Sequence, residues 1–115
     1  MFQKDMRISL LLDFYGDILS ERRREIITLY YDEDFSLSEI AEHTGISRQG
    51  VRDSIKKSEA ELRELEEKLA LASRFERLRQ QVQTLSGELS LLADAHDELA
   101  QPLRNIAKEL EELSI

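Results

Sequence analysis

The sequence predicts an all-α protein, in which a small helical bundle with a helix-turn-helix is followed by a C-terminal helical extension. Two patterns carry this prediction: two helix starts and one sharp turn between residues 36 and 57, and a strict heptad of apolar residues in the second half. The composition agrees, because 41% hydrophobic residues suffice for a modest core and 35% charged residues suit helices with wet outer faces. We expect a helix-turn-helix domain over residues 1–72 and the helical extension over residues 73–115.

The first predicted helix is the floor of the bundle. Residues 4–15 hold seven apolar side chains in a dense segment that ends at Gly16, so several neighbours must cover this helix. A second helix starts at Ser20, and a turn follows it over residues 32–35. The inward face of the second helix consists of Ile26, Ile27, Leu29, Tyr30 and Tyr31.

Three adjacent cations, Arg22, Arg23 and Arg24, occupy the first turn of the second helix. Positive charge at a helix N-terminus opposes the helix dipole, so the cluster invites an acidic neighbour or a bound anion such as a phosphate. The simpler interpretation is a solvated face with Glu21 and Glu25 as partners, and we favour it slightly.

Residues 36–57 carry the pattern that predicts the helix-turn-helix. Ser36 and Glu39 form a capping box, and Gly45 permits the left-handed conformation that ends the helix. Ser47 caps the next helix, whose Val51 and Ile55 pack back on the first.

The exposed face of this second helix is the one candidate binding site. It presents Arg48, Gln49, Arg52, Lys56 and Lys57, with Ser47 at its start. Arginine and glutamine read the edges of guanine and adenine, and lysine suits phosphates. Asp53 lies among them and repels phosphate. A mixed-charge helix with arginine anchors suits a protein partner equally well.

Steps of three and four continue from Val51 to Leu69, with Ser58 in one core position, so the recognition helix is long. The apolar phase slips between residues 70 and 75. Ser73 and Glu76 offer another capping box, which predicts a break near Ser73.

The second half carries the heptad, which predicts a helix seam that pairs with another helix. The core positions are Leu78, Val82, Leu85, Leu89, Leu92, His96, Leu99, Leu103, Ile106, Leu110 and Leu113. The seam can pair with its copy in a homodimer, which we prefer, or fold back as a hairpin onto the first domain. We expect at least one bend, since Gly87 and Pro102 weaken a continuous helix. On the seam, His96 is expected to be a polar core residue that sets the register.

No enzyme constellation is present in the sequence, and we expect neither catalytic residues nor a cofactor. The chain has no cysteine, which excludes disulfides and thiolate ligands. His43 is expected on an outer helix face beside Glu42, and no histidine pair has metal-ligand spacing. We therefore expect no metal site.

The net charge of −8 lowers the expectation of tight nonspecific nucleic-acid binding. Residues 1–57 hold 9 Lys/Arg and 11 Asp/Glu, whereas residues 58–115 hold 7 and 13, so the acidity lies mainly in the second half. Local basic patches still act at contact range, because salt screens distant charges over about 10 Å. The apolar run of residues 8–12 is too short for a signal-peptide core or a membrane span, which favours a cytoplasmic protein without a membrane partner.

Residues 8–69 resemble the YlxM helix-turn-helix proteins of bacteria and, more distantly, region four of sigma factors. The most specific pieces are LLDFY, LYY followed by a turn and SLSEIA, and ISRQ with Val51, Asp53 and Ile55. The resemblance implies a cytoplasmic, non-enzymatic protein tied to the signal recognition particle, acting on its RNA and protein. The chain departs from the family pattern at Gly50, Arg52 and Ser54, where the pattern has Ala, an aromatic residue and Asn. Gly50 loosens the helix start, and Arg52 makes the face more basic.

The leading hypothesis is a regulatory protein that binds the signal recognition particle through this basic face and self-associates through its tail. A sequence-specific DNA-binding regulator is the alternative, in which the same residues enter the major groove and the tail forms the dimer. A third hypothesis is an interaction scaffold, in which the acidic tail binds the partner.

Overall fold

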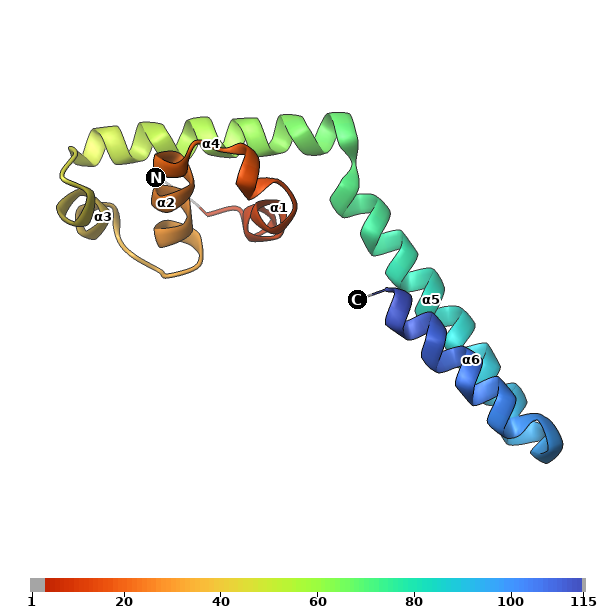
Figure 1. Ribbon diagram of the computed structural model, residues 1–115. Coiled ribbons are helices and arrows are strands. Elements are labelled where there is room, and N and C mark those ends of the chain that lie inside the picture. Colours follow the sequence, from red (N-terminus) through yellow and green to blue (C-terminus); the bar gives the residue numbers. More distant parts are fainter. Residues whose placement is uncertain (1–3, 115) are drawn as a thin grey trace. The chain divides into compact units, whose positions relative to one another are not determined.

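The computed structural model describes residues 4–114, and these form helices without any strand, which confirms the all-α fold class (Figure 1). The chain divides into two units, residues 1–72 and residues 73–115. The elements are α1 (Arg7–Tyr15), the 3-10 helix η1 (Gly16–Ile18), α2 (Glu21–Tyr31), α3 (Leu37–Thr44), α4 (Arg48–Leu69), α5 (Leu71–Ala95), the 3-10 helix η2 (Asp97–Leu99) and α6 (Ala100–Leu113).

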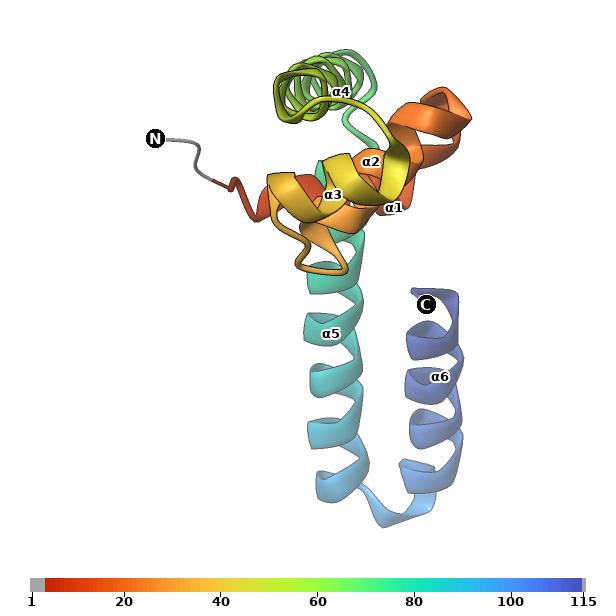
Figure 2. The same cartoon turned by 90° about the vertical axis from the view of Figure 1, so that its left-hand side faces the viewer.

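In the first unit, α1, α2 and α3 pack against one side of α4 (Figures 1 and 2). The core between them is apolar. Its most deeply buried residues are Ile8, Tyr15, Ile26, Ile27, Ile40, Val51, Ile55 and Leu62, each with at most 1% of its surface exposed. The long helix α4 is therefore the common support of the bundle, and its outer side is left open.

The predicted helix starts of the helix-turn-helix are confirmed. The Ser36 hydroxyl accepts from the Glu39 N–H at 3.1 Å, and Glu39 Oε1 accepts from the Ser36 N–H at 3.0 Å, so the capping box is complete. Gly45 has φ 76° and ends α3 in the left-handed conformation. Ser47 then caps α4 by accepting from the Gly50 N–H at 3.0 Å.

A helix break is present close to the predicted one, but it lies at Ala70 and not at Ser73: α4 ends at Leu69, and Ala70 alone, at φ 54° and ψ 33°, separates it from α5. The reason lies in the first turn of α5, whose free N–H groups need acceptors. Tyr15 Oη accepts from the Leu71 N–H at 3.0 Å, and Glu66 Oε1 accepts from the Ala72 N–H at 3.0 Å. These side chains from the bundle replace a capping box.

The second unit is a hairpin of two antiparallel helices, α5 and α6, which lie side by side in Figures 1 and 2. Its seam is filled by Val82, Ser86, Ala93 and Ala107, all buried. The Ser86 hydroxyl lies 3.2 Å from the Ala107 carbonyl oxygen on α6. Leu89, Leu103 and Leu110, at the same heptad position as Val82, are half-buried, so the seam combines large apolar residues with small ones that let the two helices approach closely.

The predicted bend in the tail is confirmed, but it lies between α5 and α6 and at neither Gly87 nor Pro102, and its position corrects the expectation for His96. The chain turns at residues 96–99, so His96 is exposed in the turn and is not a seam residue. Helix α5 continues through Gly87 without a break. Pro102 lies in the first turn of α6, where a backbone N–H has no intrahelical acceptor and its loss costs little.

Candidate nucleic-acid interface

The outer face of α4 carries the residues predicted to bind a partner. Val51 and Ile55 are fully buried on the opposite face and fix the helix against the bundle. The predicted residues lie on the outside: Arg48, Gln49, Lys56 and Lys57 are exposed and Arg52 is half-buried. The face therefore belongs to a rigid element whose position is set by the core.

Residues four apart on a helix stand in one row. Arg48, Arg52 and Lys56 form such a row, which we call the cationic row, and it contains positive charge only. A row of three cations on an exposed helix face is suited to contact successive phosphates or an acidic surface.

The neighbouring row is mixed in charge. Gln49 Nε2 donates to Asp53 Oδ1 at 3.0 Å, one turn along the helix, and Lys57 follows one turn later. The carboxylate therefore holds the Gln49 amide along the helix, where it competes with any base edge or partner group. Lys57 directly follows Lys56, so the mixed row ends in a positive charge beside the cationic row.

The start of α4 is crowded around its cap. Ser47 uses its hydroxyl as the helix cap, so its oxygen is already engaged by the Gly50 N–H. A Cβ added at Gly50 would lie 3.2 Å from Ser47 Oγ and 3.6 Å from Ile46 Cδ1. Gly50 therefore gives up helix propensity but leaves the cap unobstructed.

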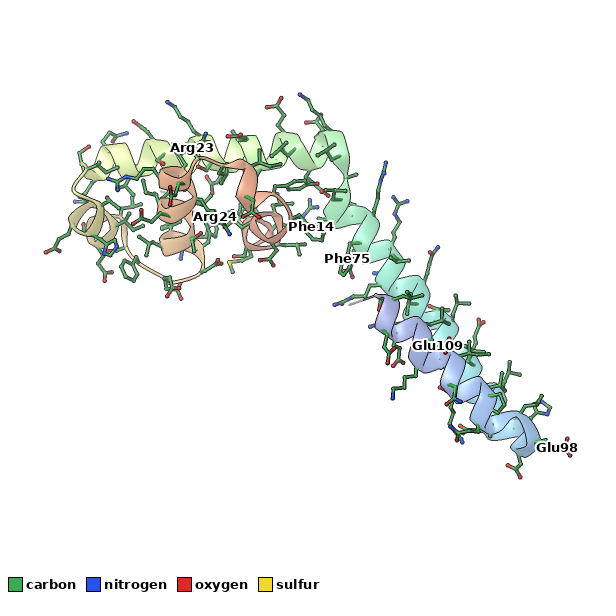
Figure 3. The ribbon with its side chains drawn as sticks, viewed as in Figure 1. Phe14, Arg23, Arg24, Phe75, Glu98 and Glu109 are labelled. Carbon is green, nitrogen blue, oxygen red and sulfur yellow. The ribbon has the colours of Figure 1, made fainter. Side chains whose placement is uncertain are left out.

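The three arginines of α2 contact three different elements of the first unit, and Arg23 and Arg24 are labelled in Figure 3. Arg22 Nη2 donates to the Thr44 carbonyl at 2.6 Å and so satisfies the C-terminus of α3. Arg22 Nη1 also lies 3.9 Å from Glu25 Oε2. This arginine joins two helices of the unit.

The other two arginines form ion pairs with carboxylates of the first unit. Arg23 Nη1 lies 2.8 Å from Glu61 Oε2, and its Nε donates to the buried Ser58 hydroxyl at 3.2 Å. Arg24 forms an ion pair with Asp17 of η1. Phosphate contact by the cluster stays a prediction, and a phosphate there would compete with carboxylates already in place.

His43 lies on the outer side of α3, as the sequence indicates. Its Nε2 is 3.7 Å from Glu25 Oε1, and its ring meets Phe35 edge-on with centroids 6.1 Å apart. The side chain is about half exposed, which suits a surface contact between α3 and α2.

Two glutamates of α4 are buried, which we did not predict from the sequence. Glu59 is 7% exposed and accepts a hydrogen bond from Tyr31, and Glu66 is 9% exposed and accepts one from Tyr15. Burial raises the pKa of both tyrosines above 10.0, and the carboxylate contacts add to the rise. The signal was present in the sequence, because Glu59 and Glu66 share the inward phase of Ile55 and Leu62. These pairs join α1 and α2 to α4 and do not reach the outer face.

Other kinds of site are not found in the part of the chain that the structure describes. Residues 4–114 contain no group of three or more His, Asp or Glu side chains placed to hold a metal ion. Among the same residues, every helix is too short or too polar to cross a membrane.

Comparison with known proteins gives the family. The model of the UPF0122 family, described as "Putative helix-turn-helix protein, YlxM / p13 like", matches residues 2–102. The chain belongs to the UPF0122 family. A UPF0122 protein of Geobacillus kaustophilus is 42% identical over 113 residues, which cover 98% of this chain and 99% of the relative. A UPF0122 protein of Halalkalibacterium halodurans is 43% identical over 100 residues, covering 87% and 92%. The UPF0122 match spans both the bundle and much of the hairpin.

Proposed function

We propose that this UPF0122 protein is a helix-turn-helix regulatory protein of the signal recognition particle pathway, and that it binds the particle's RNA or protein through the outer face of α4. The cationic row is the observation that carries the proposal, since it places three like charges on a helix fixed by a buried opposite face. The tie to the particle rests on the resemblance of residues 8–69 to YlxM proteins.

The electrostatics favour a local contact over long-range attraction. The whole chain carries −8, so a nucleic acid is repelled at a distance and attracted only near the cationic row. We therefore expect few phosphate contacts, selective binding and moderate salt dependence. Loss of the three phosphate contacts should make the slope of log K against log salt concentration shallower by about 2 to 3.

Fluorescence anisotropy tests the proposal with intact protein, labelled signal recognition particle RNA, the RNA with its protein, and random duplex DNA, each at two salt concentrations. The test variant replaces Arg48, Arg52 and Lys56 with Ala. Its matched control replaces Lys68, Arg79 and Lys108 with Ala, because these exposed residues carry the same charge away from the face.

Preferential binding to the particle or its RNA, lost in the test variant and kept in the control, supports the proposal. Equal binding to all nucleic acids, or equal losses in both variants, contradicts it, because net charge alone would then explain the affinity.

A DNA-binding regulator is the second candidate, favoured by the residue types Arg48, Gln49 and Arg52 at the start of the second helix of the motif. Selection of bound sequences from random duplex DNA distinguishes it from the first. Enrichment of one sequence, or of two copies a helical turn apart, favours DNA as the ligand.

A further inference from the structure

The hairpin leaves a line of large apolar side chains on its surface. They are Leu78, Leu85 and Leu92 on α5, and Leu99, Ile106 and Leu113, which lie seven residues apart from the turn along α6; we call this set the leucine ladder. Their exposed fractions are 48%, 48%, 48%, 54%, 47% and 77%. Each side chain is thus about half in water or more, unlike the buried seam beside it.

The ladder lies outside the contact between the two helices. Small residues recur every seven positions next to it and fill the seam: Ser86, Ala93, Ala100, Ala107 and Ser114 are all buried or half-buried. The Ser86–Ala107 contact puts the preceding residues, Leu85 and Ile106, at the same level of the hairpin. The two halves of the ladder therefore run alongside each other as one apolar face.

The other side of the hairpin is polar. Arg104 Nη2 of α6 lies 2.9 Å from Asp94 Oδ1 of α5, and Glu111 Oε1 lies 2.8 Å from the Ser86 hydroxyl. Both contacts join α5 to α6 on the polar side of the hairpin, away from the leucine ladder. The hairpin is therefore two-sided, with an ion pair and a hydrogen bond between the helices on one face and apolar side chains on the other.

We propose that the leucine ladder is the interface with a second copy of this chain, in which two hairpins form a four-helix bundle. Size is the first argument. The unit of residues 73–115 is near the length below which a fold needs a disulfide, a metal or oligomerisation. The chain has no cysteine, and the described residues hold no metal cluster, so oligomerisation is the means that remains.

Shape is the second argument for a second copy. A straight ladder shared by two antiparallel helices is complementary to itself under a two-fold rotation, and in either two-fold arrangement every helix has antiparallel neighbours. From Leu78 to Leu92 the ladder extends about 21 Å along α5. Leucine at a seven-residue repeat is the pattern that packs in such bundles.

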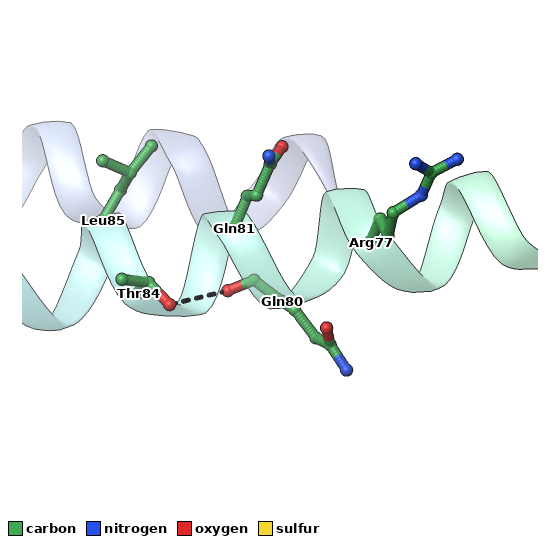
Figure 4. Close-up of a pocket in the computed structure, with 5 residues that line it drawn as sticks. All are labelled: Arg77, Gln80, Gln81, Thr84 and Leu85. Carbon is green, nitrogen blue, oxygen red and sulfur yellow. Dashed lines mark hydrogen bonds between the residues drawn. The ribbon is translucent and has the colours of Figure 1, made fainter.

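Charge is the third argument, because the rim of the ladder is self-complementary. Arg77 and Glu88 of α5 and Glu109 of α6 flank the ladder, and none of them makes an ion pair among residues 4–114. Arg77 also lines a shallow surface groove with Gln81 and Leu85 of the same helix (Figure 4). In one two-fold arrangement Arg77 approaches Glu109 of the partner, and in the other it approaches the partner's Glu88. An apolar centre with a charged rim is the usual composition of a protein interface.

Sedimentation equilibrium of the full chain tests the proposal, with twice the chain mass of 13.4 kDa expected at micromolar concentration. The ladder variant is Leu85→Glu with Ile106→Glu, and it should sediment as a monomer. The matched control is Gln83→Glu with Gln101→Glu, which adds the same two charges at exposed positions outside the ladder and should stay dimeric. A monomeric wild-type chain, or a ladder variant that dimerises like the control, overturns the proposal.

A charge reversal keeps the test decisive if the ladder variant loses its helical circular dichroism. Arg77→Glu changes an exposed rim residue, and it should weaken the dimer about tenfold by placing like charges together. Adding Glu109→Arg restores the dimer in the first arrangement, and adding Glu88→Arg restores it in the second. An Arg77→Glu protein with unchanged dimer affinity, or rescue by neither second change, counts against the ladder as the interface.

Discussion

The Tyr15 hydroxyl lies 2.7 Å from Glu66 Oε1, in the buried space between α1 and the end of α4. The same two groups accept the N–H groups of Leu71 and Ala72, the first residues of α5. One tyrosine and one glutamate therefore connect the first helix to the last turn of α4 and to the start of the next helix.

Replacing Tyr15 with Phe should lower the free energy of unfolding by about 1 to 3 kcal/mol, because it removes the buried hydrogen bond to Glu66 and takes the acceptor away from the Leu71 N–H. Urea unfolding followed by circular dichroism measures the change. Ser90→Ala removes an exposed hydroxyl from α5 and serves as the control. Equal stability of the Tyr15→Phe and wild-type proteins would show that the contact contributes nothing.

The tyrosines should resist ionisation in alkali until the protein unfolds. Burial is the main cause that raises the pKa of Tyr15, Tyr30 and Tyr31 above 10.0, with Glu66 adding to the rise for Tyr15 and Glu59 for Tyr31. A raised folded-state pKa favours the neutral form, so the stabilisation is fully present below pH 10 and is lost as the pH rises further.

Ultraviolet absorbance reads this directly, because the chain has three tyrosines and no tryptophan. We expect tyrosinate to appear together with the loss of helical circular dichroism. A tyrosine that titrates near pH 10 with the helices intact would contradict the prediction.

Ala70→Gly should stabilise the first unit. Ala70 has φ 54°, a conformation that costs an alanine about 1 kcal/mol or more and a glycine little, although glycine loses more chain entropy on folding. The net gain is expected to be below about 1 kcal/mol. Ala60→Gly, at an exposed position inside α4, should destabilise by about 1 kcal/mol. Thermal unfolding should show a higher Tm for Ala70→Gly and a lower Tm for Ala60→Gly. A lower Tm in both proteins would contradict the prediction.

Asp53→Asn should increase affinity for the nucleic-acid ligand by about threefold, since it removes a negative charge one turn from Gln49 and beside the cationic row. Anisotropy with the particle's RNA measures the effect. Asp97→Asn makes the same change in the exposed turn of the hairpin and should leave affinity unchanged. Equal effects of both substitutions would show that the face of α4 has no special part in binding.

Local chemistry made much of the first unit predictable. Ser36, Glu39, Gly45 and Ser47 act through neighbours within four residues, so their roles follow from spacing alone. Ala70 could not be predicted in this way. An alanine carries no signal for a left-handed turn, and the acceptors that place the break there come from Tyr15, distant in sequence, as well as from Glu66.

The position of the hairpin turn could not be predicted from the apolar heptad. The apolar heptad passes through the turn without an error in spacing, so periodicity indicated one helix with a bend. The second repeat, from Ser86 to Ser114, was the available signal, because small residues every seven positions indicate a closely packed helix pair.

The sequence predicted which residues of α4 are exposed, but not which partners the polar and charged side chains contact. The exposed positions of α4 follow from the burial of Val51 and Ile55. The Gln49–Asp53 hydrogen bond and the internal partners of Arg22, Arg23 and Arg24 depend on side-chain geometry that residue types alone do not fix.

The Tyr15 contact with Leu71 also bears on how the chain folds during synthesis. These residues are 56 positions apart, whereas Ser86 and Ala107 of the hairpin are separated by 21. Local contacts form faster than distant ones. At translation rates of about 5 to 20 residues per second, α1 precedes its last partner by about 3 to 11 s. Helix α1 can meet η1 and α2 soon after it is made, but its complete set of contacts forms only seconds later, when Leu71 has been added to the chain.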